Sequence, residues 1–129
     1  MKMDWKPWRI ALAIGLALPF FAVSPRLHAQ LELITFDYPF QAQKLAGIAV
    51  DPSGSSVMGV LIEDCDATFK RVRASTRTDE NGHFALHGSR LGGTHYLRVS
   101  KDGFDPMQMT VDLKPGASAE LTIQLHVAT

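Results

Sequence analysis

The side chains that could support catalysis or bind a metal ion are few in this sequence, and their spacing does not suit a shared site. His83 and His87 are the closest pair of histidines. On the strand expected there, four residues at ~3.3 Å each separate them by roughly 13 Å, whereas zinc ligands lie ~2 Å from one ion. His95 shares the parity of Leu97 and Val99, which predicts an inward position away from His87. We therefore expect no metal, no cofactor and no catalytic residues, and histidines that face solvent or the core edge.

Several carboxylates fall in or beside the expected turns, and oxygen ligands of this kind suit calcium. They are Asp51, Glu63, Asp64, Asp66, Asp79 and Glu80. Their spacing does not match a known calcium loop. We therefore interpret them as solvated turn carboxylates, with a calcium site at one end of the domain as the alternative.

Cys65 is the only cysteine of the 129-residue chain, so an internal disulfide is excluded. Its neighbours Asp64 and Asp66 oppose formation of the thiolate, and no adjacent histidine activates it. A partly buried, unreactive thiol is the favoured interpretation, and an intermolecular disulfide is the alternative.

Residues 1–29 have the pattern of a secretory signal peptide. Three basic residues precede an uncharged apolar run over residues 10–24, which is shorter than the roughly 20 residues needed to span a bilayer. Leu27-His28-Ala29 then resembles a cleavage site. This pattern predicts a mature chain that begins at Gln30 and is secreted or periplasmic. The alternative is that the helical signal peptide stays uncleaved as a membrane anchor.

Removal of this segment changes the charge balance. The whole chain has 13 basic and 13 acidic residues, and residues 1–29 contain four of the basic and one of the acidic ones, which leaves nine against 12. No cluster of Lys and Arg remains to neutralise phosphates, so nucleic-acid binding is not expected. The ~100 remaining residues suit one domain with one core.

From residue 45 onward the sequence reads as about seven short strands separated by turns. Residues 57–63 are expected to form one strand, and apolar residues alternate with polar ones over 107–113 and 121–127, which indicates one buried and one solvent-facing side. Asn81-Gly82 is a strong signal for a hairpin turn. The turns carry a set of structural residues: Asp51, Gly54, Gly59, Asp79, Asn81, Gly82, Gly93 and Gly103. No helical period is sustained after residue 29, and this spacing of strands predicts an all-β sandwich.

Three stretches together resemble the carboxypeptidase regulatory-like domain. They are residues 47–60 (GIAVDPSGSSVMGV), residues 78–84 (TDENGHF) and residues 93–104 (GTHYLRVSKDGF). The resemblance covers residues 45–127 and implies a transthyretin-like Greek-key β-sandwich, of the superfamily that includes starch-binding-like folds. It also implies a non-catalytic domain of the kind that accompanies metallocarboxypeptidases and bacterial surface proteins.

Three features depart from that family pattern. His95 stands where the family usually has Tyr, and Asp64 stands where an inward aliphatic residue is expected. Ile48 and Val50 are apolar at positions of the first strand that should face solvent, which suggests a covered or contacting surface.

The segment of residues 30–44 precedes the domain as a strand or a linker. Four apolar side chains share one face of an amphipathic strand and are possible partner contacts: Ile34, Phe36, Tyr38 and Phe40. Pro39 restricts this strand to a sheet edge or to a position outside the sheet. We expect the segment either to fold over its own domain, covering Ile48 and Val50, or to add to the sheet edge of a partner.

These observations predict a secreted, non-catalytic module with a structural or protein-binding role in the cell envelope or outside the cell. The sequence does not identify its partner, an envelope protein or an extracellular ligand, and no membrane contact is expected after cleavage. The alternative is a weak carbohydrate- or ligand-binding domain. Since no Trp follows residue 29, only Tyr38 and Tyr96 remain as stacking platforms for a sugar.

Overall fold

The computed structural model describes residues 31–87 and 92–129, and every regular element within them is a β-strand. The expected signal peptide and its cleavage site after Ala29 lie outside these residues. Within the described residues, the nine strands are β1 (Ile34–Thr35), β2 (Phe40–Ala42), β3 (Ala46–Val50), β4 (Leu61–Cys65), β5 (Val72–Arg77), β6 (His83–Ala85), β7 (Gly93–Ser100), β8 (Met107–Leu113) and β9 (Leu121–Gln124). In the same residues, no helix is long and apolar enough to cross a membrane.

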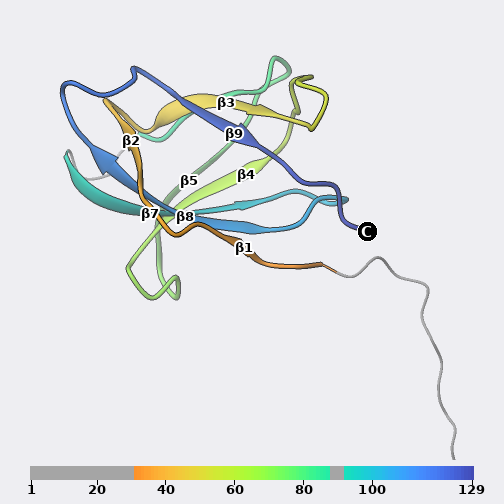
Figure 1. The fold of residues 1–129 in the computed structure, drawn as a ribbon, viewed down its shortest axis with the longest axis horizontal. Coiled ribbons are helices and arrows are strands. Elements are labelled where there is room, and N and C mark those ends of the chain that lie inside the picture. Colours follow the sequence, from red (N-terminus) through yellow and green to blue (C-terminus); the bar gives the residue numbers. More distant parts are fainter. Residues whose placement is uncertain (1–30, 88–91) are drawn as a thin grey trace, which may run out of the picture.

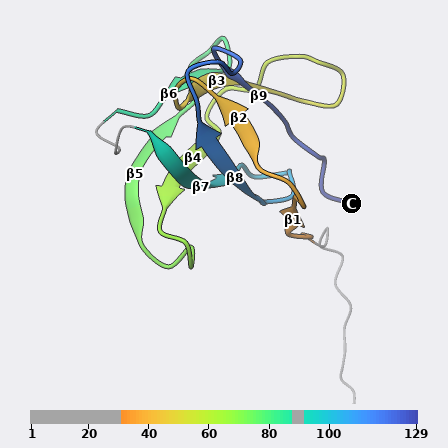
Figure 2. The same ribbon diagram turned by 60° about the vertical axis from the view of Figure 1, so that its left-hand side comes forward.

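The strands form two sheets that pack face to face (Figure 1, Figure 2). The larger sheet has the strand order β1-β8-β7-β4-β5, with β2 also paired to β8, and the smaller sheet has the order β6-β3-β9. Both views show the smaller sheet above the larger one. The all-β sandwich predicted from the sequence is confirmed. Strands β3 to β9 are the expected seven, and β1 and β2 come from the segment that precedes the domain.

The core fills the space between the two sheets. Alternation on β4 and β7 turns Ile62, Leu97 and Val99 inward, where they are fully buried, and they share one cluster with Ala49 and Ile123 of the smaller sheet. Burying one Val, Leu or Ile side chain contributes roughly 1.5–3 kcal/mol. Because an internal disulfide is not available, this cluster is the main source of stability.

A close contact between β3 and β9 depends on Gly47. These strands pair in parallel, with Gly47 beside Leu121. A Cβ at Gly47 would overlap the backbone carbonyl of Leu121. The first strand of the family-like motif therefore needs glycine for backbone packing, and not for a turn.

The turn from Asp79 to His83 corrects one prediction. A two-residue hairpin of the Asn-Gly kind needs positive φ at both residues, but of this pair only Gly82 has one, at 81°. The turn instead carries the chain from β5 in the larger sheet to β6 in the smaller one. A Cβ on Gly82 would lie 2.7 Å from Cβ of Ser56 and 2.9 Å from the carbonyl oxygen of Ala49. Gly82 therefore sits where the chain passes between the sheets, and its packing requires glycine as strictly as its φ does.

Three turns share one hydrogen-bonding arrangement, and they begin at Asp51, Asp66 and Asp79. In each turn the aspartate carboxylate accepts the backbone N–H groups two and four residues later. The N–H three residues later donates to the carbonyl of the aspartate. That third residue has positive φ and is Gly54 in the first turn and Gly82 in the last, but Phe69 in the middle one. Phe69, at φ 60°, is thus a bulky residue in a conformation that favours glycine.

The three aspartates act as acceptors for their own turns. Hydrogen bonds lower the pKa of each carboxyl group, and the strongest single donors are the hydroxyl of Ser53 to Asp51, the hydroxyl of Thr68 to Asp66 and the N–H of His83 to Asp79. Gly93 and Gly103, also predicted as turn residues, have positive φ as well.

Residues 57–63 do not form the single strand expected from the sequence. A turn at Gly59, with φ 79°, precedes β4, which begins at Leu61. Thr78 holds this turn in place: its buried hydroxyl accepts the N–H of Val60 at 2.9 Å and donates to the carbonyl of Val57 at 2.7 Å. Thr78 thus bonds to Val57, Gly59 and Val60, while the N–H of Val57 donates to the carbonyl of Ala49 on β3.

Candidate functional site

The segment before the domain forms the edge of the larger sheet. Strands β1 and β2 both pair in parallel with β8, in the register Ile34 to Met107 and Phe40 to Val111. Further bonds anchor the start of the segment, since the N–H of Glu32 donates to Oδ1 of Asp105 at 3.0 Å. Pro39, which has no N–H to donate, lies between the two strands.

The side chains of this segment do not share one face, because the chain bends at Asp37 and Tyr38 and breaks the alternation. Ile34 and Phe40 pack against the core. Leu33, Phe36 and Tyr38 are 53%, 39% and 82% exposed, and we call these three residues the exposed segment surface. The segment joins the sheet of β8. The residues that it was expected to cover, Ile48 and Val50, belong to β3 of the other sheet and are half-buried.

An apolar groove of about 270 Å³ opens beside the exposed segment surface. It is lined by Phe36, Phe40, Met107, Met109, Thr122, Ile123, Gln124 and His126. The rings of Phe36 and Phe40 meet edge to face, with centroids 5.0 Å apart. The groove thus separates the β1–β2 edge of the larger sheet from β9 of the smaller one. Methionine and aromatic side chains of this kind adapt to apolar partners.

Strand β9 adds a second feature to this side of the sandwich. It is the end strand of the smaller sheet, and in the part of the chain that the structure describes only β3 pairs with it. Thr122 and Gln124 are exposed on it. An unpaired strand edge offers backbone donors and acceptors to an added strand.

A buried acid–base pair occupies the interior between β4 and β7. Nδ1 of His95 lies 2.9 Å from Oδ2 of Asp64, and Nε2 of His95 lies 3.0 Å from the carbonyl oxygen of Gly92. A carbonyl only accepts, so Nε2 carries a proton, and another proton lies between Nδ1 and the carboxylate. Oδ1 of Asp64 has no hydrogen-bond partner among the described residues.

This pair explains two departures from the family pattern at once. The inward position of His95 agrees with its predicted parity, and Asp64 is buried at the position where an aliphatic residue was expected. Sequence reasoning treated these residues separately. The signal that connects them was that both polar residues fall at inward positions of strands, where each needs a buried partner.

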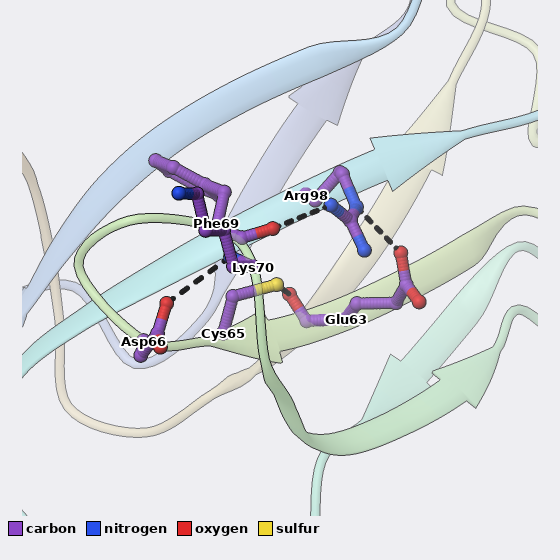
Figure 3. Close-up of polar contacts among 6 residues, drawn as sticks. All are labelled: Glu63, Cys65, Asp66, Phe69, Lys70 and Arg98. Carbon is purple, nitrogen blue, oxygen red and sulfur yellow. Dashed lines mark hydrogen bonds and ion pairs between the residues drawn. The ribbon is translucent and has the colours of Figure 1, made fainter.

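A second acid–base pair joins β4 and β7 on the outer face of the sheet (Figure 3). Nε of Arg98 donates to Oε1 of Glu63 at 2.8 Å, and the guanidinium also donates to the carbonyl of Phe69 at 2.8 Å. The ring of Phe69 packs edge to face on Tyr96, with centroids 6.0 Å apart. These contacts hold Phe69 in its unfavourable backbone conformation and fold the β4–β5 turn over Cys65.

Cys65 is a free and buried thiol. Burial raises its pKa, an effect that the nearby Arg98 opposes and Glu63 reinforces. The thiolate is therefore scarce at neutral pH, which argues against a nucleophilic role.

The remaining candidates do not form a site in the described part of the chain. No group of three or more His, Cys, Asp and Glu side chains there is arranged to hold a metal ion. Tyr96 packs against Phe69, and neither Tyr38 nor Tyr96 lines the apolar groove. The expected turn residues Asn81 and Gly103 lie in turns, and Asp51 begins one.

Comparison with known families identifies the domain. The carboxypeptidase regulatory-like domain matches residues 44–126, which is most of the described chain. The chain belongs to this family. Members of the family are generally non-catalytic. No curated protein matches this chain.

Proposed function

We propose that this carboxypeptidase regulatory-like domain is a secreted, non-catalytic module that binds another protein in the cell envelope or outside the cell. The observation that carries the proposal is the exposed segment surface, Leu33, Phe36 and Tyr38, beside the apolar groove and the free edge of β9. Exposed apolar side chains beside an apolar groove are typical of interaction sites.

The geometry favours an extended apolar segment of a partner as the bound element. A strand added to β9 would donate and accept main-chain hydrogen bonds along its edge, while its alternate side chains enter the groove between β9 and the β1–β2 edge. Phe36, Phe40, Met107 and Met109 would contact those side chains. Secretion rests on the basic start, the short apolar run and the Ala29 cleavage pattern of residues 1–29.

A site-specific crosslink tests the binding surface. A photoreactive amino acid placed at position 38 should give a discrete adduct in intact cells, because Tyr38 is the most exposed residue of the surface. The same probe at Met58, which is 60% exposed but lies outside this surface, is the matched control. Equal labelling from both positions, or no adduct from position 38, would contradict the proposal.

Secretion is tested separately by mass spectrometry of the protein recovered from the envelope or the medium. The expected chain begins near Gln30. Recovery of the chain with Met1 in the membrane fraction would show an anchor instead.

A further inference from the structure

A second hollow, distinct from the apolar groove, lies at one end of the larger sheet. This terminal cavity has a volume of about 390 Å³. It is lined by Leu31, Gly59, Leu61, Arg77, Ser100, Lys101, Asp102, Gly103, Phe104 and Pro106. Leu61 stands between Arg77 and Ser100 on three neighbouring strands, since it pairs with Arg77 on one side and with Ser100 on the other.

Two cationic side chains converge on Gly59 at the wall of this cavity. The guanidinium of Arg77 donates to the carbonyl oxygen of Gly59 at 3.2 Å. The ammonium of Lys101 lies so near the same residue that a Cβ on Gly59 would be 3.2 Å from Nζ. Two like charges held near one residue repel each other, and an anion bound between them would turn that repulsion into attraction.

The described chain does not supply that anion. Neither Arg77 nor Lys101 forms an ion pair with any carboxylate in residues 31–87 and 92–129. Asp102 lines the same cavity, but it lies beyond ion-pair distance of both cations.

The other walls are apolar or neutral. Leu31, Leu61, Phe104 and Pro106 provide apolar surface, and Ser100 provides a hydroxyl. The turn that carries Lys101 is fixed, because the N–H of Phe104 donates to the carbonyl of Lys101 and Phe104 forms a β-bridge with Val127. A cavity of this size with a few polar groups on one side has the general form of a small-ligand site.

We propose that the terminal cavity binds a carboxylate carried on an apolar group. Arg77 and Lys101 hold the carboxylate beside Gly59, and the apolar group lies against Leu61 and Phe104. Charge-assisted hydrogen bonds from a guanidinium suit carboxylate geometry, while an ammonium adds a point charge. Two sources have this chemistry: the C-terminal residue of a peptide with an apolar last side chain, and a free apolar carboxylic acid.

The test is an amide-detected NMR titration of the protein purified from cells that express the full sequence. N-acetyl-leucine should shift the amide signals of Gly59, Ser100 and Lys101, and N-acetyl-leucinamide, which lacks the carboxylate, should not. Hexanoate distinguishes the sources: weaker binding than N-acetyl-leucine indicates a peptide terminus, and equal binding indicates any apolar acid. Equal shifts with inorganic phosphate would overturn the proposal, because phosphate does not use the apolar walls.

Matched variants assign the effect to the two cations. Arg77→Gln with Lys101→Gln should weaken N-acetyl-leucine binding by at least about tenfold, since each lost charged hydrogen bond is worth roughly that factor or more. Arg73→Gln removes an exposed cation from the same strand, outside the cavity, and should leave binding unchanged. Absence of shifts, or shifts that persist in the double variant, would overturn the proposal. Partner crosslinking at position 38 reports on another surface, so the two proposals fail independently.

Discussion

Strands β4 and β7 are joined by two acid–base pairs that lie on opposite faces of one sheet. On the outer face, Glu63 and Arg98 are 2.8 Å apart and their side chains are 16% and 32% exposed. On the inner face, Asp64 and His95 are 2.9 Å apart and their side chains are 2% and 1% exposed. The two acids are neighbours in the sequence, so alternation along β4 alone places one pair on the partly exposed outer face and the other in the core.

The difference shows why the same contact distance does not imply the same energetic role. The outer pair keeps part of its contact with water, and ion pairs at the protein surface contribute about 0–1 kcal/mol. The inner pair has lost its hydration, and its mutual attraction compensates for that loss only while both partners are present. The inner pair is therefore costly to break, although it is not necessarily a large source of net stability.

Removal of one inner partner is expected to have the largest effect. His95→Leu leaves the Asp64 carboxylate buried with neither oxygen hydrogen-bonded, so the free energy of unfolding should fall by about 3–5 kcal/mol. Denaturant unfolding at neutral pH measures this change. A loss below about 1 kcal/mol would mean that water reaches Asp64 and that the two faces do not differ as described.

Replacement of both inner partners sharpens the comparison. Asp64→Val combined with His95→Leu removes the buried polar groups together, so the double variant should be as stable as the natural domain to within about 1 kcal/mol, or more stable. The two single variants complete a double-mutant cycle. If their losses simply add in the double variant, the pair is not coupled in the way its geometry indicates.

Removal of one partner of the outer pair should lower the free energy of unfolding by less. Arg98→Met keeps the aliphatic stem but removes the hydrogen bonds to Glu63 and to the carbonyl of Phe69. The free energy of unfolding should therefore fall by about 1 kcal/mol. Glu63→Gln, which leaves the bond to Phe69 intact, is the control and should cost less. If Arg98→Met lowered the free energy of unfolding as much as His95→Leu does, the two faces of the sheet would not differ as described.

The smallest effect concerns the turn that the outer pair holds. Hydrogen bonding, first from the hydroxyl of Thr68, lowers the pKa of Asp66 in the folded state below its ordinary value of 3.8. The stabilisation is therefore complete above pH 3.8 and is lost as the pH falls through the lower folded pKa. Asp66→Asn should reduce the melting temperature slightly at neutral pH and flatten its decline in acid. Glu80→Gln, at an exposed position, should leave the acid profile unchanged; an identical profile for Asp66→Asn would refute this role.

Sequence patterns were sufficient for the strands whose alternation was regular. The segments of residues 107–113 and 121–127 were expected as strands; β8 occupies the first, because period-two burial is a local property of the chain, but β9 ends at Gln124 and Val127 is 54% exposed. The hairpin expected at Asn81-Gly82 was wrong, since the same local signal also fits a turn that crosses between sheets. The continuous face expected for Ile34 to Phe40 was wrong as well, because a bend at Asp37 and Tyr38 resets the alternation.

The sequence by itself determined the all-β class, the family and the inward position of His95, since these follow from composition, turn residues and parity along single strands. Only the tertiary structure decided what lies beside each residue. It placed Asp64 against His95, Phe69 under Arg98, and Arg77 with Lys101 around Gly59. These contacts join residues 18 or more positions apart in the chain. The pairing register and sheet packing that set such distances leave no local pattern in the sequence.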